Sequence, residues 1–163
     1  MSEAYEEVIE GTTIPRRAPT AAHELLVSRL HAAVRAALPL NSTLRLLPPR
    51  SALELHETCV LCPDLAIVRF DPRAPEAPAR LYLAAEILLP GDHHADTVVK
   101  KEIWAAQRLT RLWLVDPRYL NVEIYGHGEF GFTLLNILAN RDDLTDPFLP
   151  GFTLSMPDLF AGL

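Results

Sequence analysis

Apolar residues recur with helical spacing in the N-terminal third of the chain. They stand at Leu26, Leu30, Val34 and Leu38. Positions three or four apart lie on one face of a helix, so the pattern predicts an amphipathic helix over residues 21–37. Thr20 precedes it as an N-cap whose hydroxyl can accept a backbone hydrogen bond, and Pro39 follows where the helix is expected to end.

The next part of the chain carries the patterns of β-strands. Short strands are predicted at residues 43–47 and 52–57, and a longer one at 64–70. The run at 81–89 is apolar on both alternating faces, which is typical of a strand in the middle of a sheet covered by helices. Glu86 is the only charged residue in that run.

The C-terminal half alternates between the two kinds of pattern. A second helix is predicted over residues 96–109, followed by strands at RLWLVDP and NVEIYG. The final PFLPGFTLSMPDLF segment is expected to form an edge strand and a short helical turn. This order predicts an α/β fold in which a mixed central β-sheet is flanked by helices, in a single domain over residues 1–163.

The composition is that of an ordinary globular domain. Hydrophobic side chains make up 49% and charged ones 22% of the 163 residues, enough for one sizeable core. The acidic start has no apolar stretch of signal-peptide length, and no apolar run approaches the ~18 residues that span a bilayer. We therefore expect a soluble, cytoplasmic protein that does not enter a membrane.

The charge balance restricts the kind of partner. A formal net charge of -6 disfavours strong non-specific binding to nucleic acid, because phosphate backbones are bound by clustered Lys and Arg. Any contact with DNA would have to be concentrated on one basic face. The basic residues available for such a face are Arg16, Arg17, Arg45, Arg50, Lys100, Lys101, Arg108 and Arg111.

Two carboxylates come together if strands 64–70 and 81–89 form an antiparallel hairpin. A central turn places Asp64 almost opposite Ile87, with Glu86 about 5 Å away on the neighbouring strand. Carboxylates on apolar strands repel each other and lose hydration, so they require protonation or a cation. Mg2+ is the natural partner, with Mn2+ as a substitute. The expected metal-binding set is Asp64, Glu86 and the facing Ile87.

Lys100 is the candidate catalytic cation. It lies one turn into the helix that follows Glu86, and its long side chain can return over the carboxylates. Mg2+ with an ammonium beside it suits phosphodiester hydrolysis, because the metal polarises the phosphoryl group and activates water. A purely structural interpretation also fits, with Glu86 buried in an ion pair and Asp64 capping a surface turn. Spacing alone leaves both open.

Four segments resemble, in order, the Uma-two family of PD-(D/E)XK restriction endonucleases: CPDLAIVRFDP, LAAEILLPGDHHADTVVKKEIW, RLWLVDPRYLNVEIY and PFLPGFTLSMPDLF. The resemblance extends over nearly the whole chain. It implies a restriction-endonuclease-like core and Mg2+-dependent DNA hydrolysis. In that family a Pro-Asp on one strand and a Glu on the next supply the acidic pair, which Asp64 and Glu86 match. The family's lysine has migrated to the following helix, where Lys100 stands.

The N-terminal segments are similar to the family as well. EEVIEG resembles its opening acidic hairpin, and PTAAH its proline-rich turn before a helix-borne histidine. The resemblance therefore adds Glu7 and His23 to the expected catalytic residues. Leu89 stands where the family usually has a serine, and Thr12 where it has a second acidic residue. The alternative is a weak or inactive relative that binds DNA or assembles as a homo-oligomer.

A second copy of the chain is the other expected partner. RLWLVDP and NVEIYG are apolar strands expected near the end of the sheet, and double-strand cleavage usually needs two active sites. A closed two-fold pair would protect such an edge, so we expect a homodimer.

Three further features allow other interpretations. Residues 59–62 have C-x-x-C spacing with His56 nearby, but three local ligands fall short of a zinc site, and we expect buried thiols. The DHHAD segment at 92–96 is expected to be a solvated loop with a helix cap. Trp104 and Trp113 lie in apolar periodic segments, so we expect them in the core and not stacked on bases.

Overall fold

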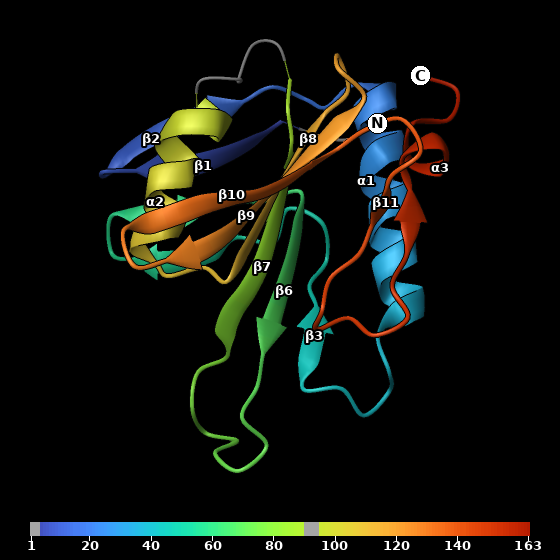
Figure 1. Ribbon diagram of the computed structural model, residues 1–163. Coiled ribbons are helices and arrows are strands. Elements are labelled where there is room, and N and C mark those ends of the chain that lie inside the picture. The colour runs from blue at the N-terminus through green and yellow to red at the C-terminus, as the bar shows by residue number, and fades with distance from the viewer. Residues whose placement is uncertain (1–3, 90–94) are drawn as a thin grey trace.

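A six-stranded mixed β-sheet forms the centre of the computed structural model, which describes residues 4–89 and 95–163 (Figure 1). In spatial order its strands are β10 (Gly131–Leu138), β9 (Asn121–Gly128), β8 (Arg111–Asp116), β7 (Arg80–Ile87), β6 (Leu65–Arg69) and β3 (Leu44–Leu46). β7 and β8 pair in parallel, whereas the other neighbouring pairs are antiparallel. The α/β fold with a mixed central sheet is therefore confirmed.

A four-stranded antiparallel sheet packs against one face of the central sheet. Its strands, in spatial order, are β2 (Thr12–Arg16), β1 (Tyr5–Ile9), β5 (Cys59–Leu61) and β4 (Leu53–His56). β1 and β2 form the expected N-terminal hairpin, which turns at Glu10 and Gly11. Both residues have positive φ, 51° and 77°, as a tight two-residue hairpin turn requires.

The first helix, α1 (Ala21–Ala37), has the predicted bounds. The Thr20 hydroxyl accepts a hydrogen bond from the backbone N–H of His23 at 3.2 Å, which confirms the predicted N-cap. α1 and the short C-terminal helix α3 (Met156–Phe160) cover one face of the central sheet (Figure 1).

The second helix differs from its prediction at both ends. A π-helical turn at Ala95–Val99 precedes α2 (Lys100–Ala106). The helix ends early because Arg108 adopts a left-handed φ of 54°, which an α-helix cannot contain. α2 lies on the side of the central sheet opposite α1, beside the β1–β2 hairpin (Figure 1).

β7 is buried on both of its faces, as the apolar run predicted. Leu83 and Ala85 pack into a core with α1 and α3, whereas Ala84 packs into a second core with α2 and the four-stranded sheet. Trp113 is fully buried in the first core and Trp104 in the second, which confirms both as core residues. The candidate site is built where these two layers meet around the end of β7.

The edges of the sheet differ from the prediction. RLWLVDP forms the interior strand β8, and β10, which the apolar pattern did not predict, forms an edge. The C-terminal segment forms the expected short strand and helical turn, as β12 (Leu154–Ser155) and α3, and β12 pairs with β11 (Asp143–Leu144) in a separate two-stranded sheet. The position of a strand within a sheet depends on pairing between segments far apart in the chain, and local sequence patterns do not contain that information.

Cys59 and Cys62 are buried free thiols, as expected. Residues 92–94 of the DHHAD segment lie outside the described residues. Within the described ranges, the helices are too short or too polar to cross a bilayer.

Candidate active site

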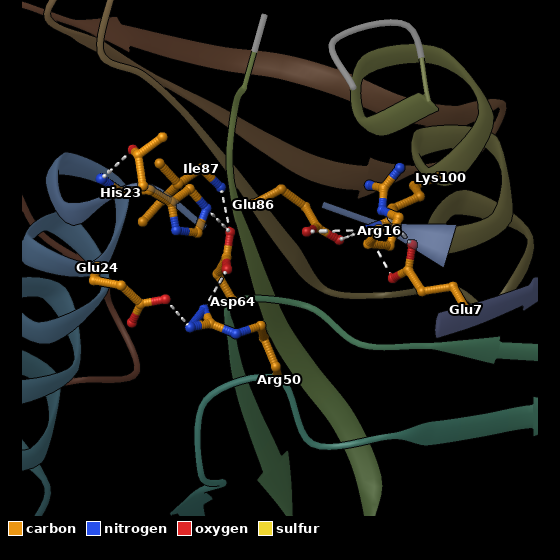
Figure 2. A network of polar contacts seen from close by, with 10 residues as sticks. Glu7, Arg16, His23, Glu24, Arg50, Asp64, Glu86, Ile87 and Lys100 are labelled. Carbon is orange, nitrogen blue, oxygen red and sulfur yellow. Dashed lines mark hydrogen bonds and ion pairs between the residues drawn. The ribbon is translucent and has the colours of Figure 1, made fainter. Parts of the chain in front are cut away.

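The candidate residues come from separate elements and meet around the start of β6 and the end of β7 (Figure 2). Glu7 lies on β1, His23 in the first turn of α1, Asp64 directly before β6, Glu86 on β7 and Lys100 at the start of α2. All five residues are buried, with exposed fractions between 0% and 4%. Because buried charges are unfavourable unless they are paired, their contacts decide what the site can do.

Asp64 lies beside the end of β7, across the β6–β7 hairpin. Leu65 pairs with Ala85, and continuing this register by one residue sets Asp64 opposite Glu86. The sequence analysis placed Asp64 opposite Ile87, one residue too far along. The difference arises because the pairing of Arg69 with Arg80 centres the turn between residues 74 and 75, one residue earlier than predicted, and the extra residue of β7 offsets only half of the resulting two-residue shift.

Three donors hold the Asp64 carboxylate. Its Oδ2 accepts the Ile87 backbone N–H at 2.9 Å and lies 3.1 Å from His23 Nε2. Its Oδ1 accepts from Arg50 Nη1 at 3.2 Å, and Arg50 also pairs with Glu24 (Figure 2). Burial by itself would raise the pKa of Asp64, but the His23 contact and the Ile87 N–H outweigh burial and lower it below its usual value. Asp64 is thus a buried carboxylate, and its interpretation as a surface turn cap is wrong.

Lys100 joins the other two carboxylates. Its Nζ lies 2.8 Å from Glu7 Oε1 and 3.3 Å from each carboxylate oxygen of Glu86. Glu7 Oε1 also accepts the Cys62 backbone N–H at 2.8 Å, and Glu7 Oε2 lies 3.0 Å from Arg16 Nε. Two carboxylates therefore face two cations in this buried cluster, so each buried group has one of opposite charge beside it. The Glu86–Lys100 pair is compatible with both the structural and the catalytic interpretation.

The helix register brings Lys100, and not Lys101, to the carboxylates. Lys101 Nζ lies 4.3 Å from the centre of the Tyr125 ring, on another side of α2. Consecutive helical residues differ by about 100° around the axis, so only one of the two lysines can reach the site.

The donor set fits a hard divalent cation. Asp64 and Glu86 offer carboxylate oxygens, and Mg2+ is commonly held by one or two carboxylates, with waters and substrate phosphates completing its shell. Within residues 4–89 and 95–163, no group of three or more His, Cys, Asp or Glu is arranged around a common metal position. The Ile87 N–H is a donor to Asp64, so only the Ile87 carbonyl could serve as a metal ligand.

Two residues of the site, Tyr5 and Arg50, were not among the candidates from sequence. The Arg50 guanidinium carbon lies 6.0 Å from the centre of the Tyr5 ring. Burial, followed by the negative charge of Asp64, raises the pKa of Tyr5. The alternation of β1 could have identified Tyr5, which stands two residues before Glu7. Arg50 has a left-handed φ of 56°, and no local pattern links it to the site.

Comparison with known proteins identifies the family. The Uma2 family model, described as "Putative restriction endonuclease", matches residues 2–157. The chain belongs to the Uma-two family. A solved structure from Anabaena variabilis, described as "a putative nuclease belonging to DUF820", is similar with a TM-score of 0.77 and 18% identity, over 95% of this chain and 89% of that one. At this identity the likeness shows the fold alone. No match was found among curated proteins.

Membership of the Uma-two family supports a nuclease-like function. The five residues that the family resemblance singled out form polar contacts in two neighbouring halves of the site. Asp64 and His23 form one half, and Glu7, Glu86 and Lys100 form the other (Figure 2).

Proposed function

We propose that this Uma-two chain is a Mg2+-dependent DNA endonuclease that hydrolyses phosphodiester bonds. The observation that carries the proposal is the buried ammonium of Lys100, 3.3 Å from Glu86. Glu86 lies on β7, which pairs with β6, and Asp64 directly precedes β6. An acidic pair with a fixed cation beside it is the set that metal-assisted phosphodiester hydrolysis requires. The family description supports a nuclease.

Asp64 and Glu86 would hold the metal, Mg2+ or Mn2+, with the Ile87 carbonyl as a further ligand. When bound, the ion supplies Lewis-acid polarisation of the phosphoryl group and an activated water. The protein's contribution is to keep Asp64 ionised before the metal arrives. The lowered pKa of Asp64 serves this purpose, because no proton has to be displaced at neutral pH.

Lys100 stabilises the negative charge that develops on the phosphoryl oxygens in the transition state. Glu7 contacts the same ammonium at 2.8 Å and so fixes its position. His23 orients Asp64 from the other half of the site, at 3.1 Å. Glu7 and His23 thus act as positioning residues in this proposal, through Lys100 and Asp64.

A nuclease assay on duplex and single-stranded DNA tests the proposal. Wild type should cleave with Mg2+ or Mn2+ and stop in EDTA. Asp64→Asn keeps the size of the side chain and should lose activity by about 100-fold or more, because it removes a ligand charge. The matched control is Asp143→Asn, at an exposed position of β11. Cleavage by Asp64→Asn at the wild-type rate would contradict the proposal.

A second function is favoured by one observation. Each oxygen of Asp64 and Glu86 already contacts a protein donor or cation. A weak or inactive relative could therefore keep the network as a scaffold for binding DNA or for homo-oligomeric assembly. DNA binding without cleavage, and without any response of stability to Mg2+ or Mn2+, would support this alternative.

The proposal includes a homodimer formed through β10, one of the two edge strands of the central sheet. Leu134, Leu135 and Ile137 on this strand are 44%, 52% and 49% exposed. The strand carries no charge that would oppose pairing with a second copy. Such a pair would cover the apolar edge and bring two sites onto one duplex.

A further inference from the structure

Tyr5 lies on the same face of β1 as Glu7. Side chains of a strand alternate between its two faces, and in β1 the inward positions are Tyr5, Glu7 and Ile9, whereas Glu6 is exposed. Glu7 reaches Lys100 from this face at 2.8 Å. The Tyr5 side chain therefore enters the site from the same side as Glu7.

The Tyr5 ring also adjoins the other half of the site. Its centre lies 6.0 Å from the Arg50 guanidinium carbon, and Arg50 contacts Asp64 at 3.2 Å. The charges of Asp64, Lys100, Glu86 and Glu7 also act electrostatically on the phenol. Tyr5 thus adjoins Arg50 in one half of the site and shares its strand face with Glu7 in the other.

The hydroxyl of Tyr5 differs from those of two other tyrosines that are partly or fully buried. Tyr82 donates to Asp146 at 2.6 Å, and Tyr125 donates to Glu123 at 2.5 Å. For Tyr5 no hydrogen bond is found within the described part of the chain, although its side chain is half-buried. A half-buried hydroxyl usually has an acceptor, so this one is available to a ligand.

We propose that Tyr5 is a substrate-positioning residue whose hydroxyl donates a hydrogen bond to a phosphate oxygen of the bound nucleic acid. The inference rests on the proposed function, because it takes a phosphodiester as the ligand. A phenol has an ordinary pKa of about 10 and is therefore a donor at neutral pH. An anionic phosphate oxygen is a strong acceptor for it. No proton transfer is assigned to Tyr5.

Tyr5→Phe removes only the hydroxyl and tests this role. The control is Tyr119→Phe, because Tyr119 is 71% exposed. Cleavage of a short duplex with Mg2+ gives kcat and KM, and binding of the same duplex with Ca2+ in place of Mg2+ gives Kd. A hydrogen bond that is equally strong in the bound substrate and in the transition state contributes to binding and not to the chemical step. We therefore expect its loss in Tyr5→Phe to raise KM and Kd about fivefold to tenfold. We expect kcat to stay within about twofold, and the melting temperature and the control variant to be unchanged.

Three outcomes would overturn the inference. If wild type cleaves and binds the duplex, and Tyr5→Phe matches it in KM and Kd, then the assignment of Tyr5 is wrong and the proposed function is unaffected. If Tyr5→Phe instead lowers kcat or the melting temperature at constant KM and Kd, then its role is not substrate positioning. If wild type neither cleaves nor binds the duplex with any metal, then the proposed function fails and the assignment of Tyr5 fails with it.

Discussion

Nζ of Lys100 lies 2.8 Å from Oε1 of Glu7, so the cation at the start of α2 is paired with the N-terminal hairpin. Both side chains are fully buried. The contact makes the β1–β2 hairpin part of the candidate site and not an appendage of the fold. It also ties the stability of the site to its charge balance, because a buried lysine requires a buried partner.

Replacing Lys100 should affect activity and stability together. Lys100→Met keeps most of the side-chain volume but leaves Glu7 and Glu86 without their shared cation. We expect a loss of about 3–5 kcal/mol in the free energy of unfolding and at least about a 100-fold loss of cleavage. Urea unfolding and the nuclease assay, run well below the melting temperature, measure the two effects.

The neighbouring lysine is the control for this prediction. Lys101→Met removes a cation–π contact with Tyr125, which should change stability by about 1 kcal/mol at most and leave cleavage unchanged. An equal loss of activity in both variants would show that the assignment of Lys100 is wrong.

The metal site can be tested without any substrate. Excess Mg2+ or Mn2+ binds only the native state and should raise the melting temperature of wild type by about 5–10 °C at 100 times Kd. Glu86→Gln should be less stable than wild type in EDTA by about 1–3 kcal/mol, because Lys100 loses a carboxylate that pairs with it. It should also lose most of the metal-induced shift.

Glu102→Gln, at an exposed position of α2, is the matched control and should keep the full shift. KCl at equal ionic strength corrects for screening. An equal shift in wild type and Glu86→Gln would exclude Glu86 as a ligand, and no shift in either would favour a structural role for the network.

Alkaline pH should weaken the fold through Tyr82. Burial, and then the hydrogen bond to Asp146, raise the pKa of Tyr82, so the native state holds this proton more tightly than the unfolded state. The stabilisation is complete below the ordinary tyrosine pKa of about 10 and is lost as the pH rises above it. Tyr82→Phe should be less stable at neutral pH by about 1.5–3 kcal/mol.

The difference between wild type and Tyr82→Phe should therefore shrink from about pH 9 to about pH 11, as measured by urea unfolding. Tyr119→Phe is the control, because this exposed tyrosine should give no pH-dependent difference. A gap that stays constant or widens with pH would contradict the prediction.

The oligomeric state can be tested at the edge strand. Light scattering at micromolar concentration should give about twice the chain mass of 18.2 kDa. Ile137→Lys places a charge on the β10 edge and should shift the mass to that of one chain. Leu40→Lys, at a fully exposed position away from β10, should leave the dimer intact. A wild-type mass of 18.2 kDa would exclude the dimer.

Local patterns in the sequence determined the parts of this protein that depend on neighbouring residues. The bounds of α1 follow from apolar spacing, Thr20 and Pro39, and the burial of β7 follows from an apolar run with a single charge. The proximity of Asp64 and Glu86 follows from one hairpin, to within one residue. These predictions hold because helix periodicity and hairpin pairing are short-range effects.

Tertiary structure alone decided which partners the buried charges have. Arg50 reaches Asp64, and Lys100 is shared by Glu7 and Glu86, so each carboxylate lies beside a cation. The same holds for β10 as an edge of the sheet. Such contacts join segments far apart in the chain, and they form because a buried charge is stable only beside its counter-charge, whichever element supplies it.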